Sequence, residues 1–309
     1  MGKATLVIHG GAGTLLKSEM SAEKEAAYLK ALTESLEAGN AILTNGGSAL
    51  TAVEVAVKSM EDSPLFNAGR GSVFTADGTH EMDASIMNGK DRMAGAVCGI
   101  SSVKNPISLS RLVMEKTDHV MLAGTGAEEF GREMNVPFES ADYFGEEWRY
   151  KQWLTVKGTD ETALDHNINP DRKFGTVGAV AVDKLGDIAA ATSTGGMTNK
   201  KYGRVGDSPI IGSGTYANNA TCAVSCTGSG EYFIRGVVAY EVSALMEFKG
   251  LTLQAACEEV VHKRLIDLGG DGGLIAIDRN GIPSMVFNTA GMYRGYLREG
   301  EEMHLAIFE

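Results

Sequence analysis

The sequence predicts a layered α+β fold, and three features support this prediction. Apolar residues make up 43% of the 309-residue chain and charged residues 22%, enough apolar material for a sizeable core. Strand-like and helix-like segments come in blocks, separated by turns that draw on 39 glycines. Strict alternation of the two would instead indicate a doubly wound parallel sheet, so stacked sheets and helices are favoured.

The chain begins with a strand and continues with two helices. Residues 4–9 are mostly apolar and end in the glycine turn HGGAG, which is typical of a strand. Asn45-Gly46-Gly47 separates the two expected amphipathic helices. Helical spacing relates the apolar residues of each: Leu29, Leu32, Leu36 and Leu43 in the first, then Leu50, Val53, Val57 and Met60 in the second.

The next segments are a block of short strands followed by a block of helices. Asp77-Gly78 is placed as the turn of a hairpin between two short strands. AGAVCGISSV is expected to form a further strand, and a helix is expected over Ile107–Lys116, after Asn105-Pro106. Two more helices are predicted near 126–134 and 140–155.

Residues 156–175 differ from what precedes them. They have little periodicity, many polar residues and a proline, so they are predicted to be a flexible, exposed linker. A structureless loop of ~20 residues is unusual in a compact domain and is often functional or a processing site.

After the linker the chain becomes apolar again. TVGAVAVDKLGDIAAATSTGG predicts two strands around a Leu185-Gly186 turn, and helices follow at about 231–248 and 252–267. The last predicted element is a hairpin, GGLIAIDRNGIPSMVFNT, turned at Asn280-Gly281.

Charge and cysteine content exclude several classes of partner. The net charge is −12 and no basic block is present, so nucleic acid and anionic membranes are not expected partners. The N-terminus does not resemble a signal peptide, and no apolar run approaches the ~18 residues that span a bilayer. The cysteines lack disulfide or zinc spacing, which indicates buried thiols and a cytoplasmic protein: Cys98, Cys222, Cys226 and Cys257.

The junction of Gly175 and Thr176 is the most informative chemical feature. A hydroxyl residue opens a strand directly after a cleavable segment, and glycine before it permits a strained backbone. If the bond between them breaks, Thr176 gains an α-amine with an unperturbed pKa of about 7.7–8.0 that can activate its own hydroxyl. The simpler interpretation is that threonine merely begins a strand, where it is common.

Several motifs together resemble one family. GTVGAVAVD, TSTGGMTNK, GRVGDSP and SCTGSGE, with HGGAG, FNAGRGSVF and MDASIM, are similar to the plant-type L-asparaginase and isoaspartyl dipeptidase family of N-terminal-nucleophile hydrolases. The resemblance runs from His9 to the last hairpin and is weakest in the linker. It implies a four-layer αββα sandwich, one domain cut into residues 1–175 and 176–309, and an (αβ)2 assembly.

The resemblance also assigns roles to residues. It implies that Thr176 is the nucleophile, that Thr194 hydrogen-bonds it, and that Thr227 and Gly228 hold the oxyanion. A guanidinium and a carboxylate in GRVGD would hold the α-carboxylate and α-ammonium of a free amino-acid head group. Without the resemblance, Arg-x-x-Asp could equally be a surface turn. The implied substrate-binding set is Arg204, Val205, Gly206, Asp207, Thr227, Gly228, Ser229, Gly230 and Asn67.

A structural sodium ion is the only cofactor that the resemblance suggests, and none is expected for catalysis. Met60–Ala68 resembles a loop that wraps sodium with backbone carbonyls, although the charge of nearby Arg70 opposes a cation there. The carbonyls concerned belong to Met60, Glu61, Ser63, Phe66 and Ala68.

The predicted function is hydrolysis of β-aspartyl dipeptides and L-asparagine with release of L-aspartate. The two substrates share one head group, so the sequence does not rank them. The main alternatives are a glycosylasparaginase, which would be expected to carry a signal peptide and disulfides, and a non-catalytic amino-acid-binding protein. A threonine protease of the same family differs around its nucleophile. No G-x-S-x-G, Walker A or G-x-G-x-x-G motif is present, which argues against an α/β-hydrolase or a nucleotide-binding protein.

Overall fold

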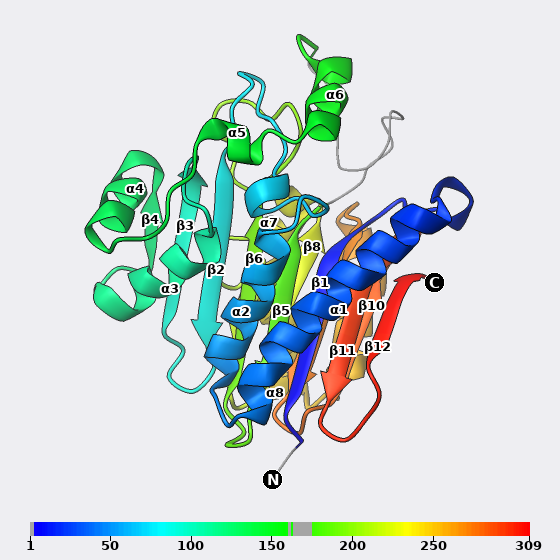
Figure 1. The fold of residues 1–309 in the computed structure, drawn as a ribbon. Coiled ribbons are helices and arrows are strands. Elements are labelled where there is room, and N and C mark those ends of the chain that lie inside the picture. Colours follow the sequence, from blue (N-terminus) through cyan, green and yellow to red (C-terminus); the bar gives the residue numbers. More distant parts are fainter. Residues whose placement is uncertain (1–2, 160–161, 163–174) are drawn as a thin grey trace.

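Two β-sheets packed face to face form the centre of the structure, a computed structural model that describes residues 3–159, 162 and 175–309 (Figure 1). Most of the predicted linker therefore lies outside the described residues. The larger sheet has the order β12-β11-β1-β5-β6-β2-β3-β4 and is antiparallel except between β3 and β4. Its strands are β1 (Thr5–Gly13), β2 (Met82–Asn88), β3 (Ala94–Ile100), β4 (Met121–Ala123), β5 (Val177–Val182), β6 (Ile188–Thr194), β11 (Gly291–Arg298) and β12 (His304–Phe308).

The smaller sheet has four strands in the order β10-β9-β8-β7, all antiparallel. Its β8 packs across β5 and β6 of the larger sheet, and β9 packs across β1. This contact places β5 and β6, which carry Thr176 and Thr194 at their ends, beside the smaller sheet. The strands are β7 (Thr215–Ala217), β8 (Cys222–Gly228), β9 (Gly272–Asp278) and β10 (Pro283–Phe287).

Helices cover both sheets. α1 (Ala22–Thr44), α2 (Ala49–Glu61) and α3 (Pro106–Lys116) pack on the larger sheet (Figure 1), and α8 (Val238–Lys249) and α9 (Leu253–Glu259) pack on the smaller one. Ser21 and Ser48 cap the first two helices by accepting backbone N–H groups. The remaining helical segments are short: α4 (Gly124–Glu133), α5 (Ala141–Phe144), α6 (Glu147–Val156), α7 (Gly230–Gly236), α10 (Leu265–Asp267), a π-helical turn (Val260–Arg264) and 3₁₀ turns at Lys17–Glu19 and Gly69–Gly71.

Two apolar cores follow from this layering. One lies between the larger sheet and its helices and includes Leu32, Val53 and Ile86, all fully buried. The other includes Val180, Val224 and Ile275 and extends from the space between the sheets to α8 and α9. Most strands therefore bury both faces, which explains why their sequences read as continuous apolar runs. The four cysteines are buried and free.

The structure corrects four details of the sequence-based assignment. Asp77-Gly78 does form a turn, closed by Thr75 N donating to the Thr79 carbonyl, but no strands adjoin it, and the neighbouring backbone also bonds to residues 199–200. The helix expected over 231–248 is split at Val237, whose φ of 47° is left-handed. The helix expected over 140–155 is two short helices, α5 and α6. The strands β11 and β12, which pair with β1 and with each other, were not predicted. None of the helices in the described ranges has the length and apolarity needed to cross a bilayer.

Candidate active site

Thr176 and Thr194 meet at the edge of the larger sheet where β5 begins and β6 ends. Their strands are neighbours, and the pairing of Val177 with Ser193 brings the two threonines side by side. Thr176 Oγ1 donates to Thr194 Oγ1 at 3.1 Å, and both residues are buried, at 7% and 4% exposure. The hydrogen bond that the resemblance implied between these two hydroxyls is therefore present in the structure.

The carbonyl of Gly175, directly before Thr176, receives two hydrogen bonds. Thr194 Oγ1 donates to it at 3.0 Å and Asn67 Nδ2 donates at 2.9 Å. The Thr194 hydroxyl can bond Thr176 and the Gly175 carbonyl at the same time. Its oxygen accepts from Thr176 Oγ1 and from Gly196 N, and its single proton is donated to the Gly175 carbonyl. Two donors on one carbonyl oxygen are the arrangement that stabilises negative charge developing there.

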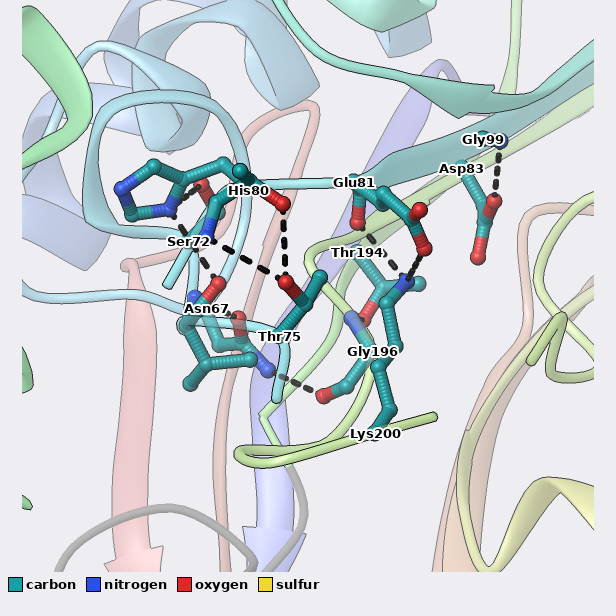
Figure 2. Close-up of polar contacts among 12 residues, drawn as sticks. Asn67, Ser72, Thr75, His80, Glu81, Asp83, Gly99, Thr194, Gly196 and Lys200 are labelled. Carbon is teal, nitrogen blue, oxygen red and sulfur yellow. Dashed lines mark hydrogen bonds and ion pairs between the residues drawn. The ribbon is translucent and has the colours of Figure 1, made fainter. Parts of the chain in front are cut away.

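Asn67 is held rigidly by the loop that carries it. Its Oδ1 accepts from Val73 N at 3.0 Å, and its Nδ2 also donates to the Gly196 carbonyl at 2.7 Å, a contact drawn in Figure 2. Asn67 was predicted to bind substrate, but its hydrogen bonds in the structure are to backbone groups on either side of Thr194. Its placement points to the Gly175 carbonyl as its target.

Arg204 and Asp207 lie together on the loop before β7 and form what we call the clamp. Asp207 is 4% exposed, and its Oδ2 has no hydrogen-bond partner among the described residues. Burial raises the pKa of Asp207 to about 7, although the positive charge of Arg204 opposes the shift. A buried carboxylate oxygen with no partner is costly unless a cation binds it, so this oxygen is placed to receive an ammonium group.

The other half of the clamp is already oriented by an acidic side chain. Arg204 Nε and Nη2 donate to the two carboxylate oxygens of Glu231 at 2.8 and 2.9 Å. Glu231 was not predicted as a site residue. A Cβ on Gly230 would lie 3.0 Å from both Arg204 Nη2 and Asp207 Oδ1, so glycine there leaves the space between the two charged groups open.

One small pocket joins the nucleophile to the clamp. Thr176, Thr194, Arg204 and Asp207 line the same pocket, although 31 residues separate Thr176 from Asp207 in sequence. The other predicted residues in its lining are Gly175, Gly206 and Gly228, and sequence reasoning did not single out Gly196, Met197 and Ser208.

The remaining predicted residues lie around this pocket rather than in its lining. Thr227 is fully buried and its Oγ1 accepts from Ala12 N at 3.3 Å, a contact to the HGGAG segment. That bond uses the oxygen as acceptor, so the hydroxyl proton can still be donated. Ser229 Oγ donates to Asp271 Oδ1 at 2.7 Å, away from the clamp. Val205 is half-buried beside Arg204 and is not part of the lining.

A buried charged cluster behind the pocket was also missed. Asp83 is the register partner of Thr194, and its pKa is raised by burial while Lys200 and Arg204 oppose the shift. Lys200 is 3% exposed and donates to the Glu81 carbonyl at 2.9 Å, as Figure 2 shows. Asp83 belongs to the quoted MDASIM segment, but lone charged residues carry no spacing signal that would have identified them.

Comparison with known proteins agrees with this geometry. The family model described as "Asparaginase" matches residues 2–307. The chain belongs to this family. It is 51% identical to the isoaspartyl peptidase of Salmonella typhimurium over 311 aligned residues, which cover 100% of this chain and 99% of the relative. It is 50% identical to the isoaspartyl peptidase of Escherichia coli, covering 100% of this chain and 97% of that protein. The plant-type L-asparaginase of Pyrococcus abyssi is 44% identical, with 96% of each chain covered.

Proposed function

We propose that this protein is an isoaspartyl peptidase and L-asparaginase that releases L-aspartate. The observation that carries the proposal is the shared pocket, in which the Thr176 hydroxyl faces the same space as the Arg204–Asp207 clamp. A guanidinium and an unpaired carboxylate match the α-carboxylate and α-ammonium of a free aspartyl head group. The names of the relatives support the same substrate class.

The first step we propose is cleavage of the chain before Thr176. Thr176 Oγ1 attacks the Gly175 carbonyl carbon, with its proton passed toward Thr194, and Asn67 and Thr194 stabilise the oxyanion. The C–N bond then breaks while the proton that left Oγ1 is delivered to the Thr176 nitrogen, which gives an ester between Gly175 and Thr176 Oγ1 and the free α-amine of Thr176. Water then hydrolyses the ester, leaving Gly175 as a carboxylate and Thr176 with its hydroxyl restored.

Turnover then uses the new α-amine as the base. It accepts the Thr176 Oγ1 proton while that oxygen attacks the side-chain amide or isopeptide carbonyl of the substrate. Thr227 and the Gly228 amide are proposed as oxyanion donors. Ammonia or an amino acid leaves with that proton, and water hydrolyses the β-aspartyl ester to L-aspartate.

The fold supports further proposals about the layers, the domain, its assembly and its compartment. Helices on the outer faces of two contacting sheets support the four-layer αββα sandwich of N-terminal-nucleophile hydrolases. We propose a single domain cut into residues 1–175 and 176–309, assembled as (αβ)2. The four free cysteines favour a reducing compartment such as the cytoplasm.

A structural sodium ion in the loop Met60–Ala68 fits the groups present. A Cβ on Gly71 would collide with the Phe66 carbonyl oxygen, so carbonyl oxygens crowd this loop closely. The Ala68 carbonyl accepts one backbone N–H at 3.2 Å and keeps a second lone pair. Arg70 donates to Glu146 at 2.9 Å, which offsets its charge. The carbonyls of Met60, Glu61, Ser63, Phe66 and Ala68 would hold the ion as hard oxygen donors.

The test is to follow mass and activity together in freshly purified protein. The 309-residue chain should convert at neutral pH into two chains, the smaller beginning Thr-Val-Gly-Ala, while L-aspartate release from a β-aspartyl dipeptide rises in parallel. An active chain that stays intact would exclude Thr176 as an N-terminal nucleophile. A chain that binds L-aspartate but hydrolyses neither substrate would indicate the amino-acid-binding alternative.

A further inference from the structure

A row of polar residues crosses the interior between the two sheets. In the larger sheet His9, Gly178, Thr192 and Ser85 are successive register partners on β1, β5, β6 and β2. In the smaller sheet Ser225 and Thr215 are register partners on β8 and β7. The five side chains of this row other than glycine are 0% exposed.

Hydrogen bonds join these side chains into one chain that alternates between the sheets at every step. We call it the hydroxyl chain. Thr215 donates to Thr192, and the single proton of Ser85 has two acceptors within reach, Thr215 Oγ1 and the Ser208 carbonyl. The successive members are His9 Nε2, Ser225, Thr192, Thr215, Ser85 and the Ser208 carbonyl, at distances of 2.9, 2.7, 2.6, 2.7 and 2.6 Å.

The hydroxyl chain lies directly below the candidate active site. Side chains two residues apart in a strand share a face, so Thr194 lies one step above Thr192, and Asp83 one step above Ser85. Thr176 precedes Gly178 by the same two residues. One step below, the row is apolar: Val7, Val180, Ala190 and Met87.

The two ends of the hydroxyl chain contact the two halves of the site. At one end His9 is the register partner of Gly178, two residues after Thr176 on the same strand. A Cβ on Gly178 would collide with Ser225 Oγ and His9 Nε2, so glycine is needed where the chain passes β5. At the other end Ser85 bonds the carbonyl of Ser208, which follows Asp207 and lines the pocket.

Buried hydroxyls are a costly way to pack two sheets unless all are satisfied. In the row one step below, apolar side chains fill the space between the two sheets. Packing of the sheets therefore does not by itself require polar residues in this row. A connected polar chain instead fixes one arrangement of its members, because a shift at any step leaves a buried hydroxyl without its partner.

We propose that the hydroxyl chain positions Thr176 relative to the Arg204–Asp207 clamp, which it reaches through Ser208, with Thr192 as its central positioning residue. The proposal rests on the proposed function, since it concerns how that site is held. Removing the Thr192 hydroxyl should disturb both ends at once, whereas changes near one end should act mainly on that end.

The test compares Thr192→Val, which keeps the shape but removes the hydroxyl, with Thr192→Ser, which keeps the hydroxyl. Thr221→Val is the matched control, because Thr221 is a buried threonine bonded to Ser243 at 2.6 Å outside the hydroxyl chain. We expect Thr192→Val to lose about 10-fold or more in kcat/KM through both lower kcat and higher KM, and to slow chain cleavage. Thr192→Ser and Thr221→Val should stay within about 3-fold of wild type.

Equal losses in Thr192→Val and Thr221→Val, at equal folded fractions, would overturn the proposal, as would failure of Thr192→Ser to restore activity. If Thr192→Val does not fold, Ser85→Ala should mainly raise KM, and Ser225→Ala should mainly lower kcat and slow cleavage. The same pattern in both alanine variants would contradict a positioning role. A wild-type protein without hydrolysis would refute the proposed function alone, because chain cleavage and calorimetric binding of L-aspartate still report on the two ends.

Discussion

The nucleophile end of the site and the clamp end use different chemistry. The contacts described between Thr176, Thr194, Asn67 and the Gly175 carbonyl all join neutral groups, and each donor there has its acceptor. At the clamp, the partly exposed Arg204 lies near the buried Asp207, whose Oδ2 has no hydrogen-bond partner among the described residues. One end is complete within the chain, whereas the other is complete only with a ligand.

In the proposed function, this difference separates the two tasks of the pocket, chain cleavage and substrate recognition. Cleavage of the chain needs only groups that the chain itself supplies, so the nucleophile end can be fully hydrogen-bonded beforehand. In the proposed function the unpartnered oxygen of Asp207 receives the substrate head group, and its burial without a partner destabilises the free protein until that group binds. Mutations at the two ends should therefore separate maturation from turnover.

The largest expected effect is that of Thr176→Ala, which removes the hydroxyl both tasks share. Chain cleavage should stop, and hydrolysis should fall by at least about 10⁴-fold. Thr176→Ser should retain part of both, because a hydroxyl remains. The measurements are intact mass and aspartate release, and wild-type release by the alanine variant would mean that another residue is the nucleophile.

Asn67→Asp tests the nucleophile end by itself. The carboxylate keeps the shape of the side chain and an acceptor for Val73 N, but it cannot donate to the Gly175 carbonyl. Losing one oxyanion donor typically costs ~10²–10³-fold in rate, so conversion of the precursor should slow by about that factor. Electrophoresis of freshly purified precursor over time measures this, and conversion at the wild-type rate would show that Asn67 is not an oxyanion donor.

The sequence predicted some residues and contacts of the nucleophile end and the clamp and missed others. The strand patterns placed Thr176 and Thr194 at strand ends, and the hydroxyl contact that the resemblance implied is confirmed. Asn67 was named as a substrate-binding residue, but its contact with the Gly175 carbonyl was not predicted, because its partners are backbone groups that leave no pattern in the sequence. Glu231 was missed because a helix-starting glutamate is common in any protein.

The fold was likewise predictable where patterns are local. Periodicity identified α1, α2 and the apolar strands, which are buried on both faces. It did not identify β11 and β12, whose mixed polar residues reflect partial exposure at a sheet edge. It also missed the break at Val237, since a left-handed valine is set by packing rather than by propensity.

Arg204→Lys should weaken substrate binding at the clamp and leave chain cleavage at the nucleophile end unchanged. Lysine offers a point charge where the α-carboxylate needs a planar, two-pronged donor. Loss of a buried charged contact typically costs ~2–5 kcal/mol, so kcat/KM for a β-aspartyl dipeptide should fall at least ~30-fold. Cleavage before Thr176 should proceed normally, because that step involves no α-carboxylate. If the variant matures and hydrolyses like wild type, Arg204 does not hold substrate.

The pH dependence of ligand binding should report on Asp207. Its pKa is raised to about 7 because the buried carboxyl resists ionisation, yet the α-ammonium requires the ionised form. Affinity for L-aspartate should therefore rise as pH increases toward 7 and level off above it, and one pH unit below the pKa should cost about tenfold. Calorimetric titrations with L-aspartate between about pH 5.5 and 8, a range that spans the pKa near 7, measure this change in affinity. Asp207→Asn should bind weakly with little pH dependence, and a wild-type profile in that variant would remove Asp207 from the clamp.

The smallest effect is expected from Glu231→Gln, which tests whether Glu231 orients Arg204 or competes with substrate for it. Glu231 occupies Nε and one N–H of Nη2, which leaves Nη1 and the second N–H of Nη2 as a two-pronged donor for an incoming carboxylate, so we expect an orienting role. Its side chain is 55% exposed, and solvent-exposed ion pairs are worth only ~0.2–1 kcal/mol, so KM should rise about 2- to 5-fold with kcat unchanged. The difference from wild type should shrink in high salt, because screening weakens the pair in the wild-type protein. A lower KM would instead show that Glu231 occupies the place of the substrate carboxylate, and the clamp would then be closed, not open, in the free protein.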